Sequence, residues 1–351
     1  MDEFYEFARD VVHLDFAALT DHDYSLTTDE WRLIQEGAIA YNHPERFVTF
    51  LGYEWAWNEG PDADHGHRNV LFARDSMPLI CSSWHGSNTP RELFDILRRV
   101  CGDPSEAISI PHHPMRRANR IWHDWDTMDP EFERLVEVFS SWGSSEKEGE
   151  PFALKGRNDP RQWEQAEEDV HPPFEAVGHS LQDGLAMGHR FGFVGGSESH
   201  DGRAGSSTMI AHLPIRKVRH NYWAGLTGIW SRRRTRECMW SSLLRRRTLA
   251  TTGPRIYADM EIDGHPMGDI VRISHAPRRL SVRVHGTAEI ERVCVVRNNE
   301  DWRTFKPGSL GCVEVIEDMP RPECVDRYYL RVTQTDGHMA WCSPLFVGEG
   351  P

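Results

Sequence analysis

Side chains that bind metal ions or transfer protons occur in four short clusters, each directly after an apolar run of the chain. The clusters are Asp21-His22, Glu54, His112-His113 and Glu198-Ser199-His200. Strands buried in a parallel sheet are continuously apolar, and barrels of such strands carry their catalytic residues at the carboxyl ends of the strands. Mixed histidine and carboxylate ligands suit zinc, manganese or iron, and several such cations can activate water and stabilise the leaving oxygen of a phosphoester. The arrangement therefore predicts a metal-dependent enzyme, and the chemistry of such a site favours hydrolysis of a phosphoester or a similar group.

Each cluster also has an ordinary structural explanation when it is taken alone. An Asp-His pair can be a hydrogen bond between neighbours, and a glutamate at a strand end can cap a turn. The His112-His113 pair is more informative because Pro111 and Pro114 fix its backbone, and adjacent imidazoles repel each other when both are protonated. Neutral imidazoles that bind a metal avoid this repulsion. Together the four clusters favour a shared site, and the lack of cysteine ligands argues against a structural zinc site.

The periodicity of the chain predicts alternating helices and strands up to about residue 256. The expected helices are 3–12, 29–40, 89–100, 178–188 and 235–247, and the expected strands are 14–19, 47–52, 67–73, 107–110, 135–139 and 191–194. Residues 143–172 are polar and charged, which is typical of an insertion loop that acts as a lid or a binding loop. The predicted fold class is therefore α/β, with a barrel over residues 1–256.

The pattern changes after about residue 257. Alternating apolar and polar residues at 280–284 and 329–333 predict strands, and Asp263-Gly264, Asn298-Asn299 and Asp336-Gly337 are turn signals between strands. We expect residues 257–351 to form a small β-sandwich-like domain.

Composition limits the partners of the chain. A formal charge of −14 over 351 residues disfavours nucleic acid or an anionic membrane surface as a partner. No apolar stretch is long enough for a transmembrane helix. The acidic first residues do not resemble a signal peptide, and the seven cysteines lack any Cys-x-x-Cys pairing, so we expect a cytoplasmic protein.

In this order, the motifs resemble the PHP superfamily (polymerase and histidinol phosphatase), specifically a bacterial branch catalogued as a domain of unknown function. The resemblance covers most of residues 1–270 and rests on Asp15–Asp23, Gly52–Trp55, Gly66–Val70, Pro111–Pro114, Val136–Val138 with Trp142-Gly143, Gly196–His200 and Arg246–Ile256. It implies a distorted seven-stranded β/α barrel with two or three divalent metal ions.

The resemblance also implies roles for individual residues. The implied ligands are His22, Glu54, His113, Glu198 and His200, with Glu54 bridging two metals and with His67 and His112 as further ligands or as their supports. Asp21 would orient His22 or transfer a proton. Arg203 follows the His200 motif, and because guanidinium groups pair well with phosphate oxygens, we expect it to bind a small anionic substrate.

Two departures from the family pattern leave alternatives open. The family's first motif, a strand ending in His-x-His, should precede the helix at 3–12. We expect it to be encoded upstream of Met1, because a barrel without its first strand exposes unpaired edges. Glu198 stands where the family usually has aspartate. The alternatives are a degenerate, truncated barrel with only a binding role, and an amidohydrolase-type enzyme that cleaves amides or esters on the same metals.

Overall fold

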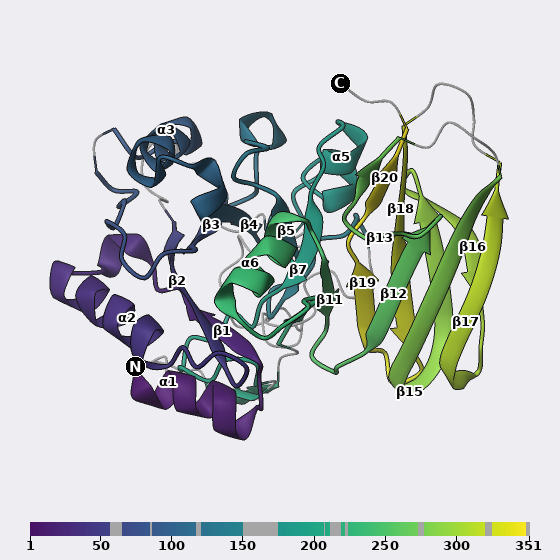
Figure 1. Ribbon diagram of the computed structural model, residues 1–351, viewed down its shortest axis with the longest axis horizontal. Coiled ribbons are helices and arrows are strands. Elements are labelled where there is room, and N and C mark those ends of the chain that lie inside the picture. The colour runs from purple at the N-terminus through teal and green to yellow at the C-terminus, as the bar shows by residue number, and fades with distance from the viewer. Residues whose placement is uncertain are drawn as a thin grey trace, which may run out of the picture.

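The computed structural model describes residues 1–56, 65–84, 86–116, 121–149, 175–206, 208–210, 219–221, 224–272, 277–319 and 325–348. Most of the insertion expected at 143–172 lies outside these residues. Figure 1 shows small sheets with helices in the N-terminal part and one large sheet in the C-terminal part. In the described part of the chain, no helix combines the length and the apolar character needed to cross a membrane.

The first sheet has the strand order β1-β2-β3-β4. Its strands are β1 (Phe16–Leu19), β2 (Val48–Trp55), β3 (His67–Phe72) and β4 (Ala107–His112). Strands β1 and β2 are parallel, whereas β3 is antiparallel to both β2 and β4. Because two reversals restore the direction, β1, β2 and β4 all point the same way. Their carboxyl ends therefore lie at one edge of the sheet.

Two capped helices pack on this sheet. Helix α2 (Thr28–Ala40) connects the parallel strands β1 and β2, and α3 (Pro90–Cys101) precedes β4. Each begins with a capping box, formed by Thr27 with Glu30 and by Thr89 with Glu92. Such a cap typically contributes about 1 kcal/mol. Shorter helical segments are α1 (Asp2–Glu6), η1 (Phe7–Val11), η2 (Asp23–Ser25), η3 (Pro104–Glu106) and η5 (Trp125–Thr127).

A second small sheet adds two more strand ends. Strand β5 (Leu135–Ser140) pairs in parallel with β7 (Gly192–Gly195) and antiparallel with β6 (Gly143–Ser144). Helix α5 (Leu181–Ala186) precedes β7. All six residues of β5 are buried, so the strand lies inside the molecule.

The C-terminal part is a large, curled and mostly antiparallel sheet. Its central strand β15 (Arg278–Arg297) pairs with four others, and its register shifts between His285 and Ile290. The other strands are β10 (Leu226–Ile229), β11 (Thr248–Thr251), β12 (Tyr257–Ile262), β13 (His265–Pro266), β14 (Ile270–Val271), β16 (Glu300–Phe305), β17 (Ser309–Asp318), β18 (Asp326–Gln334), β19 (Met339–Cys342) and β20 (Leu345–Val347). Helix α6 (Arg236–Leu244) lies between β10 and β11 in sequence, and β8 (Thr208–Ile210) pairs with β9 (Arg219–Asn221) separately.

The mixed α/β character is confirmed, and so is a strand near each expected position. The finer architecture differs from the expectation. Among the described residues, strand pairing gives separate small sheets and no closed barrel, because β3 returns antiparallel beside β2 and β1 pairs with β2 alone. The C-terminal strands form one curled sheet that also includes β10 and β11, so the boundary between residues 256 and 257 stays a prediction.

One apolar cluster joins the small sheets to the large one. Val138 of β5 and Phe193 of β7 pack in a cluster with Tyr329 of β18 and Trp341 of β19. Full burial of a large apolar side chain contributes roughly 1.5–3 kcal/mol. This packing fixes β5 and β7, and with them the loops that follow.

Candidate metal centre

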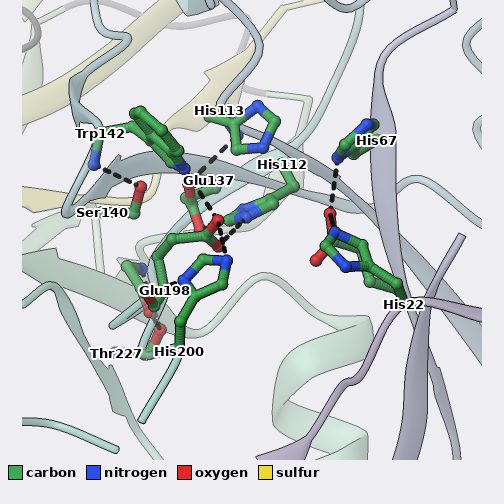
Figure 2. Close-up of polar contacts among 12 residues, drawn as sticks. His22, His67, His112, His113, Glu137, Ser140, Trp142, Glu198, His200 and Thr227 are labelled. Atoms are coloured by element: carbon green, nitrogen blue, oxygen red, sulfur yellow. Dashed lines mark hydrogen bonds and ion pairs between the residues drawn. The ribbon is translucent and has the colours of Figure 1, made fainter. Parts of the chain in front are cut away.

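The carboxyl ends of β1, β2, β4, β5 and β7 converge on a group of histidines and glutamates (Figure 2). The pairing of β1 with β2 continues past the end of β1. The backbone N–H of Glu54 donates to the carbonyl of Asp21 at 2.9 Å, and His22 forms an isolated parallel bridge with Glu54. This backbone pairing, set by the parallel register, brings the His22 side chain next to the Glu54 carboxylate.

Glu54 lies between two imidazoles. Its Oε1 is 2.7 Å from Nδ1 of His67 and 3.6 Å from Nε2 of His22. Donor atoms of these three residues all lie within 4.8 Å of one another. Burial alone would raise the pKa of the Glu54 carboxyl, but the hydrogen bonds with His22 and His67 outweigh burial and lower it to about 2. Glu54 is therefore ionised at neutral pH.

A second donor group shares Glu54. It consists of Glu54, His112 and His113, whose donor atoms also lie within 4.8 Å of one another. Both ring nitrogens of His113 are buried and have no hydrogen-bond partner among the described residues. Burial, followed by the positive charge at His112, holds the pKa of His113 well below its usual value. A buried neutral imidazole with two unsatisfied nitrogens is costly in a finished fold, and a metal ion would satisfy one of them.

The backbone is constrained at two donor residues. His113 has φ of 35° and Glu198 has φ of 52°, both in the left-handed region. Residues other than glycine are uncommon there, and backbone strain of this kind costs of order 1–3 kcal/mol and clusters at functional sites. Both residues are predicted metal ligands. The backbone strain is therefore located at positions where the site needs a particular side-chain direction.

His112 lies between two glutamates. Its Nδ1 is 2.7 Å from Oε2 of Glu137, and its Nε2 contacts Oε2 of Glu198. The second oxygen of Glu137 accepts the backbone N–H of His113 at 3.1 Å. Burial favours a neutral His112, but the charges of Glu137 and Glu198 outweigh burial and raise its pKa well above the usual value.

The loop after β7 carries Glu198 and is held by hydrogen bonds to its neighbours. The Gly196 N–H donates to the carbonyl of Phe139 at 3.0 Å, and Thr227 Oγ1 accepts the Gly195 N–H at 2.9 Å. Trp142 Nε1 donates to Oε1 of Glu198 at 2.8 Å, and His200 Nε2 lies 3.8 Å from the same oxygen. The longer side chain of Glu198, compared with aspartate, thus reaches both His112 and Trp142.

A cavity of about 380 Å³ opens beside this group. Four acidic residues line it: Asp21, Glu54, Glu137 and Glu198. Its described lining includes no lysine or arginine, and Phe16, Phe50, Leu71 and Ile110 form apolar parts of the wall. Acidic side chains in a partly apolar cavity produce a strong negative potential that attracts cations.

Most of the predicted site residues are brought together. His22, Glu54, His67, His112 and His113 make up the two donor groups, and Glu198 and His200 join them through contacts with His112 and with each other. Asp21 lines the cavity with an exposed side chain. Arg203 does not join: its side chain is exposed, and its guanidinium carbon lies 6.0 Å from the centre of the Phe7 ring.

Sequence reasoning did not assign a role to Glu137. The available signal was a single carboxylate within the apolar run Leu135-Val136-Glu137-Val138-Phe139. A charged residue that is only 3% exposed in the middle of a buried strand needs a partner, and here the partners are His112 and the backbone of His113.

Comparison with known proteins places the chain in a family. A family model described as a protein of unknown function (DUF3604) matches residues 4–210 and 210–265. The chain belongs to the DUF3604 family. The branch of unknown function expected from the motifs is thus confirmed, whereas membership of the PHP superfamily stays a prediction.

The related chains are longer and have no described activity. An uncharacterised protein of Chlamydia pneumoniae is 30% identical over 97% of this chain, and one of Chlamydia trachomatis serovar D is 28% identical over 97%. The DUF3604 chain spans 53% of the length of each, about half. A crystal structure from Bacteroides vulgatus, described as a two-domain protein containing a predicted PHP-like metal-dependent phosphoesterase, matches with a TM-score of 0.36 and 14% identity, over 97% of this chain and 90% of that chain. Similarity at this level does not establish a shared activity.

Proposed function

We propose that this DUF3604 protein is a metal-dependent hydrolase and that its substrates are phosphoesters. The observation that carries the proposal is the pair of donor groups that share Glu54, one with His22 and His67 and the other with His112 and His113. Two groups with a common carboxylate suit two divalent ions held close together. The unsatisfied, buried nitrogens of His113 support the same reading, because a metal ion would complete their coordination.

The donor set fits zinc, manganese or iron. It is made of imidazoles and carboxylates without thiolates, which is the ligand type of catalytic sites rather than of structural zinc sites. When bound, such ions supply Lewis-acid chemistry that activates a water and polarises a substrate oxygen. His22, Glu54, His67, His112, His113, Glu198 and His200 would hold them.

The charge of the cavity supports a substrate that binds through divalent cations. Its described lining is acidic and lacks lysine and arginine, so an anionic group would be repelled until cations neutralise the carboxylates. Phosphoryl oxygens bind divalent cations well and need no guanidinium when two ions are present. Asp21 lines the cavity with an exposed carboxylate and would take up or deliver a proton there.

The proposal is tested by metal analysis and turnover on one preparation. The protein, purified and reconstituted with Mn²⁺ or Zn²⁺, is assayed on p-nitrophenyl phosphate, bis(p-nitrophenyl) phosphate and p-nitrophenyl acetate. We expect more than one ion per chain and metal-dependent hydrolysis of a phosphate substrate. Hydrolysis of the acetate alone would replace the phosphoesterase by an esterase, and absence of bound metal would overturn the proposal.

A matched pair of histidine variants separates the site from general folding. His113→Ala removes an imidazole from a donor group, whereas His123→Asn replaces another buried histidine, which contacts Arg68 rather than the cluster. We expect the first variant to lose metal and turnover and the second to keep both. Unchanged metal content in His113→Ala would remove His113 from the ligand set.

A further inference from the structure

We infer that Glu137 is a positioning residue for the metal centre: its carboxylate fixes the ring orientation and tautomer of His112 and the backbone of His113 at the same time. The inference rests on the proposed metal site and adds a residue whose sequence context gave it no role. Glu137 lies in the middle of β5, and its side chain crosses to the end of β4, where both histidines are located.

Both carboxylate oxygens of Glu137 are engaged by the histidine pair. Oε2 is 2.7 Å from Nδ1 of His112, and Oε1 accepts the backbone N–H of His113 at 3.1 Å. The side chain is 4% exposed, so water does not substitute for either contact. Figure 2 shows Glu137 next to His112, on the side away from His22 and His67. The second contact holds the peptide of a residue with left-handed φ, which otherwise favours relaxation to another conformation.

The contact at Nδ1 decides which nitrogen of His112 is free to bind metal. A carboxylate only accepts hydrogen bonds, so Nδ1 must carry a hydrogen. Nε2 contacts the Glu198 carboxylate beside the cavity, so it also carries a hydrogen in this structure; a metal ion would take the place of that hydrogen, and the lone pair would then be on Nε2. Histidine ligands commonly have an acceptor of this kind behind them, which orients the ring and increases its basicity.

An amide in place of the carboxylate cannot keep both contacts while hydrogen stays on Nδ1 of His112. If the oxygen of glutamine accepts from His113, its NH₂ group faces Nδ1 of His112 and favours the tautomer with hydrogen on Nε2, where metal should bind. If the oxygen accepts from Nδ1 instead, the NH₂ group faces the N–H of His113, and two donors oppose each other. The replacement is nearly the same size, so its effect reports on hydrogen bonding and not on packing.

Space around Glu137 is also limited by Gly196. A Cβ atom at position 196 would lie 2.6 Å from Oε2 of Glu137, much closer than a normal contact. The glycine therefore lets the turn after β7 approach the carboxylate while the carboxylate keeps its position. Gly196→Ala offers a way to displace Glu137 without removing it.

The experiment measures Zn²⁺ affinity of the full chain by competition with a chelator, together with the absorption spectrum of the Co²⁺-loaded protein. We expect Glu137→Gln to weaken Zn²⁺ binding about 10- to 100-fold and to change the Co²⁺ spectrum, because loss of an outer partner of a histidine ligand typically costs that much. Gly196→Ala should weaken binding less and in the same direction.

The control is Glu146→Gln, which alters another buried glutamate. Glu146 is paired with Arg331 at 2.6 Å, and its other side-chain contacts are with Tyr329 and Trp341 rather than with His112. We expect it to lower stability and leave the Zn²⁺ affinity and the Co²⁺ spectrum unchanged. If the wild type binds Zn²⁺ and both Glu137→Gln and Gly196→Ala bind it with the same affinity, the inference about Glu137 is overturned and the proposed metal site stands. If Glu137→Gln does not fold, Gly196→Ala decides. Absence of Zn²⁺ binding by the wild type overturns the proposed function as well.

Discussion

Buried carboxylates have different partners in the large sheet and in the metal centre. In the large sheet they meet arginines: Asp326 lies 2.5 Å from Arg278, and Glu146, which contacts this sheet, lies 2.6 Å from Arg331. In the metal centre, Glu54 and Glu137 contact imidazoles and a backbone N–H, and within the described part of the chain none of their contacts is with lysine or arginine. Both arrangements bury negative charge, but only the first supplies a permanent positive charge.

The difference separates a structural ion pair from a cation site. A guanidinium stays charged at any ordinary pH, so the pair Glu146–Arg331 is complete once the chain folds. Here burial opposes the charge of Arg331, but Glu146 outweighs burial and raises the pKa of the guanidinium. An imidazole can give up its proton and bind a metal instead. Carboxylates paired with histidines therefore keep the ability to accept a cation, which carboxylates paired with arginine lack.

The largest effect is expected when a permanent pair is broken. Arg331→Met leaves Glu146 buried, with Tyr329 and Trp341 as the remaining donors to its side chain among the described residues. We expect a loss of about 3–5 kcal/mol in the free energy of unfolding, measured with urea, because an uncompensated charge remains in the interior. Metal content should stay at the wild-type level. A parallel loss of metal would show that the two regions are not independent.

The next largest effect is expected from the residue shared by both donor groups. Glu54→Gln removes the charge that joins the two groups, so we expect Zn²⁺ affinity to fall by more than the roughly 100-fold that losing an outer partner costs. Stability in the presence of a chelator should change far less than in Arg331→Met. The measurement is Zn²⁺ titration with metal counting, and an unchanged number of ions per chain would contradict a bridging role.

A histidine outside the site shows what burial beside a cation does to the pKa of an imidazole. His123 is buried with Nδ1 3.3 Å from Arg68, and burial, followed by the charge of Arg68, lowers its pKa well below 6.5. For His112, the neighbouring carboxylates raise the pKa. Because the pKa is lowered in the folded chain, His123 binds a proton below about pH 6.5 in the unfolded chain but not in the folded one. The free energy of unfolding therefore decreases as the pH falls.

His123→Asn tests this sign. Between pH 6.5 and the folded pKa, we expect the wild type to lose up to about 1.4 kcal/mol per pH unit more than the variant. Both proteins are unfolded with urea in the presence of a chelator at pH 7.5, 6.5 and 5.5, so that the other histidines contribute equally. Parallel pH profiles would show that His123 has the same pKa in the folded and the unfolded chain, so that neither burial nor Arg68 lowers it.

Much of the fold could be predicted from the chain, because the signals were local. The apolar runs 107–110 and 135–139 become β4 and β5, and Thr89 followed by Pro90 begins α3. The expected turns at Asp263-Gly264 and Asn298-Asn299 have the positive φ values that tight turns need. Donor residues such as His22 and Glu54 could be recognised because each follows or ends an apolar run.

What could not be predicted depends on contacts between distant segments. The antiparallel direction of β3 is set by pairing with β2 and β4 and leaves no mark in the apolar pattern of 67–73. Glu137 gains its role only when β5 lies near the end of β4. The charge of Arg203 suggested an anion site. Charge does not determine which way a side chain points, and the Arg203 side chain lies over Phe7 instead.

The smallest effect is expected at an ion pair on the surface. Arg233 Nε lies 2.7 Å from Glu45 Oε1, as short as many buried contacts, but the two side chains are 66% and 49% exposed. Water and salt screen such pairs, so we expect Arg233→Gln to change the free energy of unfolding by less than about 1 kcal/mol, measured with urea at low and at high salt. Comparison with Arg331→Met then contrasts an exposed pair with a buried one, since both variants remove an arginine from a glutamate at nearly the same distance. If Arg233→Gln lowered the free energy of unfolding as much as Arg331→Met, short distance and not exclusion of water would explain the strength of the large-sheet pairs. The contrast with the metal centre would then lose its physical basis.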